Sequence, residues 1–320
     1  MNLRRVWMTA TRISLLAVAF AVAVPAVAQQ ATIFPFIRSA ISARAAGLGG
    51  ATVAMIDDVS MVVMNPATLA TIREQVVTGT FLKHVLDINS GYATFADTVG
   101  SNSSYGITAI YSSYGSFERT DVNGLNLGSF TANDVCIAGS YSKELDSLIS
   151  WGGTVKLLYG SVEQQNSVAI AVDAGLLIQI PKSRTNIGFS ILNAGAQLTT
   201  YAGTSNRLPI DVRIGVNHRL KGLPLVVNFS LVQLADEVPS FFDRFMNFSV
   251  GGELSIGKYV KARLGYDNST RNLSAVNVST QLSGVSGGIG VALETMQFDY
   301  AISSLGSSAI IHRITVGLDI

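Results

Sequence analysis

The chain has 320 residues, with 22 basic and 21 acidic side chains and a formal net charge of +1. This balance excludes the strongly basic surface that nucleic-acid binding requires. Only 13% of the residues are charged, against about 25% in an average soluble domain, and the mean hydropathy is +0.38. Such a chain is either deeply buried or partly in lipid.

The first 28 residues have the pattern of a secretory signal peptide. Arg4 and Arg5 form a basic start, the apolar run ISLLAVAFAVAV follows, and the small residues AVA end at Ala28. We therefore expect residues 1–28 to be removed and the mature chain to begin at Gln29. Cys136 is the only cysteine, so the secreted chain cannot form an internal disulfide.

Residues 29–75 differ from the rest and are predicted to form a plug or hatch with short helical and irregular pieces. Residues 33–72 are rich in alanine, glycine and methionine. Asp57 or Asp58 is expected to cap a short helix that runs to Met64, and Pro66 then pushes Asn65 out of helical geometry.

From residue 76 to residue 320 nearly every segment is predicted to be a strand. Beyond residue 28 no apolar run approaches the length of a membrane helix, so a chain that enters lipid must form a closed barrel. Many of the predicted strands have the roughly 9–11 residues that cross a bilayer. The fourteen candidates lie near 76–83, 88–97, 104–112, 133–142, 150–160, 167–180, 185–193, 209–220, 224–233, 245–256, 259–267, 282–294, 296–303 and 309–320.

The predicted connections alternate in length, which is typical of outer-membrane barrels with short turns at one rim and long loops at the other. The short connections include 181–184, 221–224 and 257–258, and Thr295. The long polar connections are 113–132, 161–166, 194–208, 234–244 and 268–281.

The segment LPIDVRIGVNHRL, residues 208–220, shows the two faces of such a strand. Ile210, Val212, Ile214 and Val216 alternate with polar residues and glycine, which predicts one apolar and one polar face. The apolar face packs on a protein core in a soluble sandwich and contacts lipid in a barrel. The sorted connections favour the barrel, with a polar lumen of small residues.

Several segments carry a resemblance to a known family. They are SARAAGLGGATVAMIDDVSMVVMNPATLA (42–70), YGSFERTDVNGLNLGSFTANDV (114–135), NIGFSILNAGAQLTTY (186–201), LPIDVRIGVNHRL (208–220), GGELSIGKYVKARLGYDN (251–268) and FDYAISSLGSSAIIHRITVGL (298–318). In this order they resemble the PorV/PorQ family of FadL-like outer-membrane barrels, and the PorQ branch of the type IX secretion system in particular.

The resemblance implies an all-β transmembrane barrel of about fourteen antiparallel strands, FadL-like, with an N-terminal plug. It implies no catalysis, cofactor or metal, and it implies partners of the PorU and PorZ type that join cargo to lipopolysaccharide at the outer membrane. The plug residues singled out are Ser42, Arg44, Gly47, Gly49, Gly50, Asp57, Asp58, Asn65 and Pro66.

Two motifs have the spacing of a catalytic or a nucleotide-binding site but lack the structural context that such a site needs. GVSGG at 284–288, with Asp299 and His312, has the order of a hydrolase triad. However, the motif continues as a strand, and Ser286 and His312 fall on opposite faces of the wall. GLGGAT at 47–52 follows no strand and lacks the third glycine of a dinucleotide site. The three histidines have no metal-ligand spacing.

The loop QLADEVPSFFDRF, residues 233–245, places Phe241 and Phe242 beside acidic residues. Exposed aromatic side chains there would anchor a partner, while the alternative is that they fold back over the barrel mouth. Three functions remain open: a secretion component that docks partners, a FadL-like channel for hydrophobic small molecules with residues 40–72 as a hatch hinged at Asn65 and Pro66, and a soluble sandwich or adhesin.

Overall fold

The computed structural model describes residues 32–84, 87–274, 282–306 and 309–320, within a compact unit from Ala31 to Ile320. The predicted signal peptide and residues 275–281 lie outside this description. Fourteen strands are present: β1 Val76–Lys83, β2 Asn89–Val99, β3 Ser103–Thr120, β4 Asn126–Glu144, β5 Ile149–Val162, β6 Gln165–Ile180, β7 Thr185–Thr199, β8 Asp211–Arg219, β9 Leu225–Leu231, β10 Phe248–Ile256, β11 Val260–Asp267, β12 Val285–Ala292, β13 Met296–Gly306 and β14 Ala309–Asp319.

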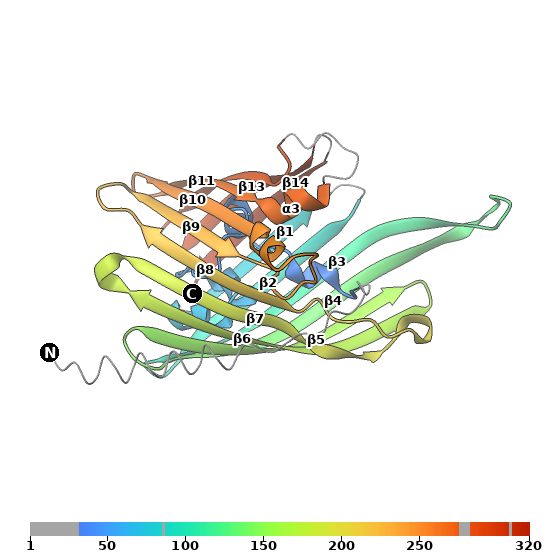
Figure 1. Cartoon of the computed structure of the whole chain (residues 1–320), viewed down its shortest axis with the longest axis horizontal. Coiled ribbons are helices and arrows are strands. Elements are labelled where there is room, and N and C mark those ends of the chain that lie inside the picture. The colour runs from blue at the N-terminus through green and yellow to red at the C-terminus, as the bar shows by residue number, and fades with distance from the viewer. Residues whose placement is uncertain (1–31, 85–86, 275–281, 307–308) are drawn as a thin grey trace. The chain divides into compact units, whose positions relative to one another are not determined.

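The strands form one closed barrel in which each pairs with its sequence neighbours (Figure 1). All pairs are antiparallel, and β1 closes the ring on β14 with Val76 opposite Asp319 and Lys83 opposite His312. Closure leaves no open sheet edge along the wall, as a membrane requires. The prediction of a fourteen-stranded barrel is confirmed, and the sandwich alternative is wrong.

The outer face of the barrel is apolar. Along β6, Ile170, Val172 and Leu176 are exposed while the alternate residues are buried. In β8, Ile214 and Val216 are exposed, whereas the Asp211 and Arg213 side chains point inward and are only 0% and 5% exposed. A continuous apolar exterior of this size suits lipid rather than water, so the apolar face of residues 210–216 is the lipid-facing one.

The connections between consecutive strands lie at the two rims of the barrel. One rim carries the chain reversals at 145–148, 181–184, 220–224, 257–259 and 293–295. The other carries the longer connections, including η5 (Tyr201–Gly203), η6 (Phe241–Met246) and α3 (Asn268–Ser274). We call the latter the long-loop rim. The short η4 (Pro181–Ser183) lies at the opposite rim.

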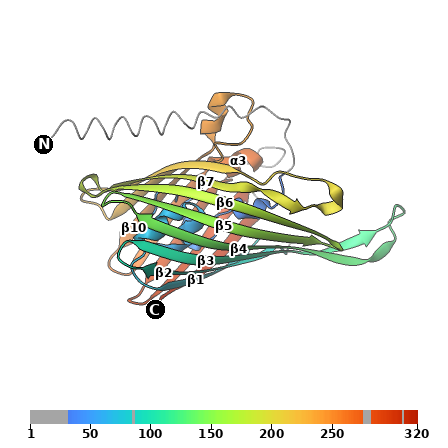
Figure 2. The same cartoon turned by 90° about the horizontal axis from the view of Figure 1, so that it is seen from below.

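Two predicted loops are partly regular. Residues 113–132 are not a loop throughout, because β3 and β4 continue as a hairpin with residues 121–125 at its tip (Figure 2). The ladder continues because Ser116 still pairs with Thr131 and the Phe117 and Phe130 rings stack at 5.4 Å, which compensates for the many Gly and Asn residues. The second difference is α3, a helical turn within the expected loop 268–281.

The N-terminal pieces lie inside the barrel, visible as blue coils within the ring of strands (Figure 1). They are η1 (Pro35–Arg38), α2 (Ala43–Gly47), η2 (Val59–Val63) and η3 (Pro66–Thr71). We call residues 32–75 the plug. No helix in the described part of the chain is long and apolar enough to span a membrane.

The lumen is not uniformly polar, contrary to the prediction. On the β1–β6 side, the inward-facing Leu82, Tyr92, Ile110 and Leu158 are buried against apolar plug residues such as Phe34. On the β8–β14 side, the inward-facing residues include charged side chains that are buried against the plug. We call the β1–β6 side, with its apolar cluster, the apolar half and the β8–β14 side the polar half; the apolar half also contains buried polar groups, among them the Lys156–Asp173 ion pair.

Candidate functional site: the plug and the lumen

The polar half of the plug interface is centred on Arg44. Ser42 begins α2, and its hydroxyl accepts a hydrogen bond from the Ala45 amide at 3.1 Å. This helical turn directs Arg44 at β10, where its Nε and Nη2 donate to the two carboxylate oxygens of Glu253 at 2.9 and 2.8 Å. A two-point contact of this kind is among the strongest side-chain pairs.

Glu253 connects the plug to a row of charges in the wall. Arg263 Nε donates to Glu253 at 2.7 Å, and Arg263 Nη1 donates to Asp299, so the four residues form what we call the ionic lattice. Burial alone would lower the pKa of Arg44, but its contact with Glu253 outweighs burial and raises that pKa above its ordinary value. Arg44 is therefore held as a cation against Glu253.

The two adjacent acids, predicted as caps, have different roles. Asp58 Oδ1 accepts from the Ser60 amide at 2.9 Å and caps η2, while its Oδ2 accepts from Arg44 at 3.4 Å. Asp57 has a left-handed backbone with φ of 58°, and its carbonyl accepts a bond from Arg44 at 3.3 Å. Both acids thus support Arg44 from the plug side.

Wall glycines allow the plug backbone to approach the strands closely. A Cβ on Gly251 would lie 2.5 Å from the Leu48 carbonyl oxygen, and one on Gly152 would lie 2.5 Å from that of Pro66. Real Cβ atoms do not come this close. Gly188 and Gly265 lie as close to plug backbone atoms, and Gly175 and Gly215 lie as close to plug side-chain atoms, so the series extends from β5 to β11.

The glycines predicted in the plug have separate functions. Gly47 packs on Gly288 of β12, and a Cβ on Gly47 would lie 3.3 Å from the Gly288 Cα. Gly49 needs its positive φ of 65° and lies against the backbone of Tyr266. Gly50 also has a positive φ but has no atom near its Cβ position. These glycines allow close packing and tight turns. No strand precedes them, although a dinucleotide-binding motif would follow a strand.

Asn65 and Pro66 tie the plug to β6. The Asn65 amide donates to the carbonyl oxygens of Val53 at 2.8 Å and Leu176 at 3.0 Å. Its side-chain oxygen accepts from the Ala67 amide at 3.1 Å and begins η3, with Pro66 in the first turn. Asn65 is fully buried. These residues therefore anchor the segment, whereas the channel hypothesis places a hinge there.

Further charged groups in the lumen were not singled out from the sequence. Lys156 pairs with Asp173 at 2.7 Å, and Lys156 also donates to Asn193 at 2.7 Å. Arg213 pairs with Asp211 at 2.6 Å. Each of these four residues lies on the polar face of its strand, so a charged residue type at an inward-facing strand position was the signal that could have found them.

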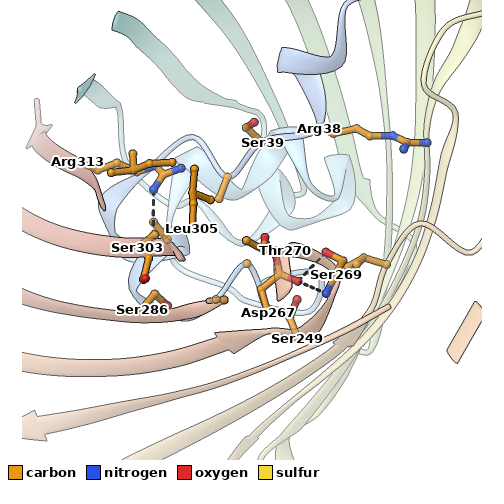
Figure 3. A pocket seen from close by; sticks show the side chains of 18 of the residues that line it. Arg38, Ser39, Ser249, Asp267, Ser269, Thr270, Ser286, Ser303, Leu305 and Arg313 are labelled. Carbon is orange, nitrogen blue, oxygen red and sulfur yellow. Dashed lines mark hydrogen bonds between the residues drawn. The ribbon is translucent and has the colours of Figure 1, made fainter. Parts of the chain in front are cut away.

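A cavity of about 300 Å³ lies between the plug and β10–β14, at the long-loop side of the lumen. Figure 3 shows Arg38 and Ser39 of the plug on one side and Arg313, Ser303 and Ser286 of the wall on the other. Its apolar lining includes Met64 and Ile311, which belong to the apolar cluster of the lumen. The cavity therefore borders both halves of the plug interface.

The structure separates the residues of the apparent hydrolase motif. Ser286 is buried and faces inward, whereas His312 is exposed and its Nδ1 lies 2.8 Å from the Tyr300 hydroxyl on the outer surface. The Asp299 carboxylate forms an ion pair with Arg263. Within the described residues no group of three His, Cys, Asp or Glu side chains has metal-binding geometry, and Cys136 is a buried free thiol in β4.

Phe241 and Phe242 begin η6 at the long-loop rim. Ser240 and Asp243 form a capping box there, and the Phe241 ring packs edge-on against Phe242 and Phe245 at 5.8 and 5.6 Å. Phe241 and Phe242 remain 67% and 76% exposed. Both rings are therefore exposed at this rim.

A closed fourteen-stranded wall with an apolar exterior and an N-terminal plug defines a FadL-like barrel. The chain resembles a Pseudomonas aeruginosa FadL homologue (11% identity, 91% of this chain, 100% of that chain, TM-score 0.58). It also resembles the Pseudomonas putida toluene transporter TodX (12%, 90%, 99%, 0.61) and the CymD monoaromatic hydrocarbon channel (14%, 88%, 97%, 0.59). At these identities the likeness establishes the fold.

No protein-family model matches the sequence, and no curated protein matches it either. The comparisons therefore support the FadL-like barrel that the resemblance implied and give no support to the PorV/PorQ branch within it.

Proposed function

We propose that the protein is a non-enzymatic outer-membrane channel for small hydrophobic molecules, in which the plug controls passage. The observation that carries this proposal is the apolar half of the lumen, where Leu82, Tyr92, Ile110 and Leu158 are buried against the plug. Porin channels that conduct water-soluble solutes have polar interiors. An apolar lumen instead favours solutes that leave water readily.

The two halves of the interface differ in what a solute can displace. On the β1–β6 side, an apolar solute replaces apolar side-chain contacts such as those of Leu69 with contacts of the same kind. On the opposite side it would separate Arg44 from Glu253 and leave buried charges without partners, which is costly. We therefore place the path along the apolar half, next to η2 and η3, with the ionic lattice retaining the plug.

The names of the structural neighbours agree with this choice, since TodX is described as a toluene transporter and CymD as a monoaromatic hydrocarbon channel. A FadL-like fold alone does not carry a substrate. The support comes from the fold together with the apolar cluster on the β1–β6 side of the lumen.

Docking of secretion partners is a second candidate, favoured by exposed apolar groups at the long-loop rim. Phe241 and Phe242 are exposed on η6, and Val122 and Leu125 are exposed at the tip of the β3–β4 hairpin. Exposed aromatic residues are common anchors in protein interfaces. PorZ-like or PorU-like surface proteins are the partners that the family resemblance implies.

Affinity purification from native outer membranes in mild detergent, with mass spectrometry of proteins and small molecules, separates the two functions. For the channel we expect the barrel without a stoichiometric protein partner, together with bound apolar molecules. A surface protein recovered in equal amount, and lost when Phe241 and Phe242 are both changed to Ser, would favour docking. The double change is a specific control because both rings are exposed at the long-loop rim.

A further inference from the structure

A second cavity, of about 290 Å³, lies at the long-loop rim between the start of the plug and strands β3 to β5. We call it the rim pocket. It shares no described lining residue with the cavity beside β10–β14. The charged side chain among its described lining residues is Asp134 of β4, which is 8% exposed.

The two carboxylate oxygens of Asp134 have different surroundings. The Tyr114 hydroxyl donates to Oδ2 at 2.7 Å. Gly160 lies opposite Asp134 in the β4–β5 ladder, and a Cβ on Gly160 would lie 2.5 Å from Oδ1 and closer still to the Tyr201 hydroxyl. Because Gly160 has no side chain, Oδ1 of Asp134 and the hydroxyl of Tyr201 border the same small space.

Asp134 differs from the other buried acids because it has no ion pair in the described structure. No Lys, Arg or His is among the described residues that line the rim pocket, and residues 29–31, 85–86, 275–281 and 307–308 contain none. A buried carboxylate without an opposite charge is unfavourable. The remaining buried acids of the described chain all pair with Lys or Arg; they are Asp173, Asp211, Glu253 and Asp299.

Three aromatic side chains line the rim pocket together with Asp134. Tyr114 comes from β3, Tyr201 from η5 and Phe34 from the plug. Phe34 is 2% exposed, and a Cβ on Gly160 would lie 2.7 Å from its Cε1 atom, so its ring borders the same space as the Asp134 carboxylate. Aromatic faces attract cations and also pack against apolar groups. The carboxylate and the rings therefore favour the same kind of ligand.

We infer that the rim pocket binds compact organic cations, with an ammonium group on Asp134 and an aromatic or short apolar body among Phe34, Tyr114 and Tyr201. The inference goes beyond the proposed channel, because binding at the rim does not require passage through the lumen. A charge-assisted hydrogen bond to the carboxylate supplies the selectivity for a cation over a neutral molecule of the same shape. The volume is at the lower end for small-molecule sites, which suits a ligand with one ring.

The test is a calorimetric titration of the full barrel in nonionic detergent at pH 7 with 2-phenylethylamine and with 2-phenylethanol, its uncharged counterpart, using detergent alone as the blank. We expect the wild type to bind the amine at least about tenfold more tightly than the alcohol, because hydrogen bonds to charged groups contribute more than neutral ones. Asp134→Asn retains the shape and an acceptor for Tyr114, and is expected to remove the preference. Glu118→Gln is the matched control, because Glu118 is an exposed acid of β3 outside the rim pocket.

Gly160→Ala tests the position of the site without changing its charge. The added methyl group would fill the space between Asp134, Tyr201 and Phe34, so we expect the affinity for the amine to fall at least several-fold. Thermal unfolding checks that the variants fold. The amine should raise the unfolding temperature of the wild type and of Glu118→Gln, as a ligand that binds the folded state does, and should leave that of Asp134→Asn unchanged.

Equal affinity for amine and alcohol in the wild type, or a preference for the amine that survives in Asp134→Asn, would overturn the inference and leave the proposed channel untouched. Unchanged affinity for the amine in Gly160→Ala would also overturn it, because the ligand would then bind elsewhere. Binding of the amine that depends on Asp134, in a barrel that does not speed hydrocarbon uptake, would support the rim pocket and contradict the channel.

Discussion

Glu253→Ala is expected to release the plug from the polar half of the wall and to destabilise the closed barrel by about 3–5 kcal/mol, the usual cost of breaking a buried charge pair. Glu253 accepts two bonds from Arg44 and one from Arg263. Its loss leaves Arg44 with only the 3.4 Å contact to Asp58 as an ion pair. The measurement is urea unfolding in lipid vesicles together with proteolysis of residues 32–75.

The matched control is Glu294→Ala, which removes an exposed acid in the turn between β12 and β13 and should change stability by less than about 0.5 kcal/mol. The double variant Arg44→Met, Glu253→Ala should recover part of the loss, because no unpaired plug cation remains. A plug that stays as protected in Glu253→Ala as in the wild type would show that the ionic lattice does not retain it.

Gly152→Val is expected to prevent η3 from seating against β5 and to open the lumen. A Cβ at this position would lie 2.5 Å from the Pro66 carbonyl oxygen and 2.7 Å from the Ala67 amide nitrogen. Backbone atoms cannot move aside as flexible side chains do, so the plug must shift. We expect a several-fold rise in the permeability of producing cells to large antibiotics that the outer membrane normally excludes.

Gly139→Val serves as the control, because Gly139 faces outward from β4 and has no atom within 4 Å of its Cβ position. It adds the same side chain to the lipid-facing surface and should leave permeability unchanged. Equal permeability for both variants, with equal amounts of folded barrel, would mean that contact with η3 does not close the lumen.

The barrel could be predicted from the sequence because strand parity and lipid contact are local properties. In β6, the alternation of Ile170, Val172 and Leu176 with small or polar residues specifies which face meets lipid, and fourteen such segments specify the ring. The hairpin of β3 and β4 was missed because its ladder depends on pairing between strands rather than on the composition of either one.

The arrangement of the lumen could be predicted less well. Arg44 was among the residues singled out, yet its partner is Glu253, more than two hundred positions away, and no local pattern specifies such a pair. The apolar half was missed because Leu82 and Leu158 face inward from strands whose outer faces are also apolar. Arg313 could be placed on the polar face by parity, but the side chains that surround it depend on the whole assembled lumen.

Uptake of a radiolabelled monoaromatic hydrocarbon such as toluene tests the central claim most directly, because the outer leaflet of lipopolysaccharide slows such molecules. Cells that lack the protein would be compared with cells that produce the wild type or Glu294→Ala, at equal amounts of barrel in the outer membrane. We predict uptake several-fold faster with either barrel than without it, and no change for a neutral sugar. Uptake at the same rate with and without the barrel would contradict the proposed channel.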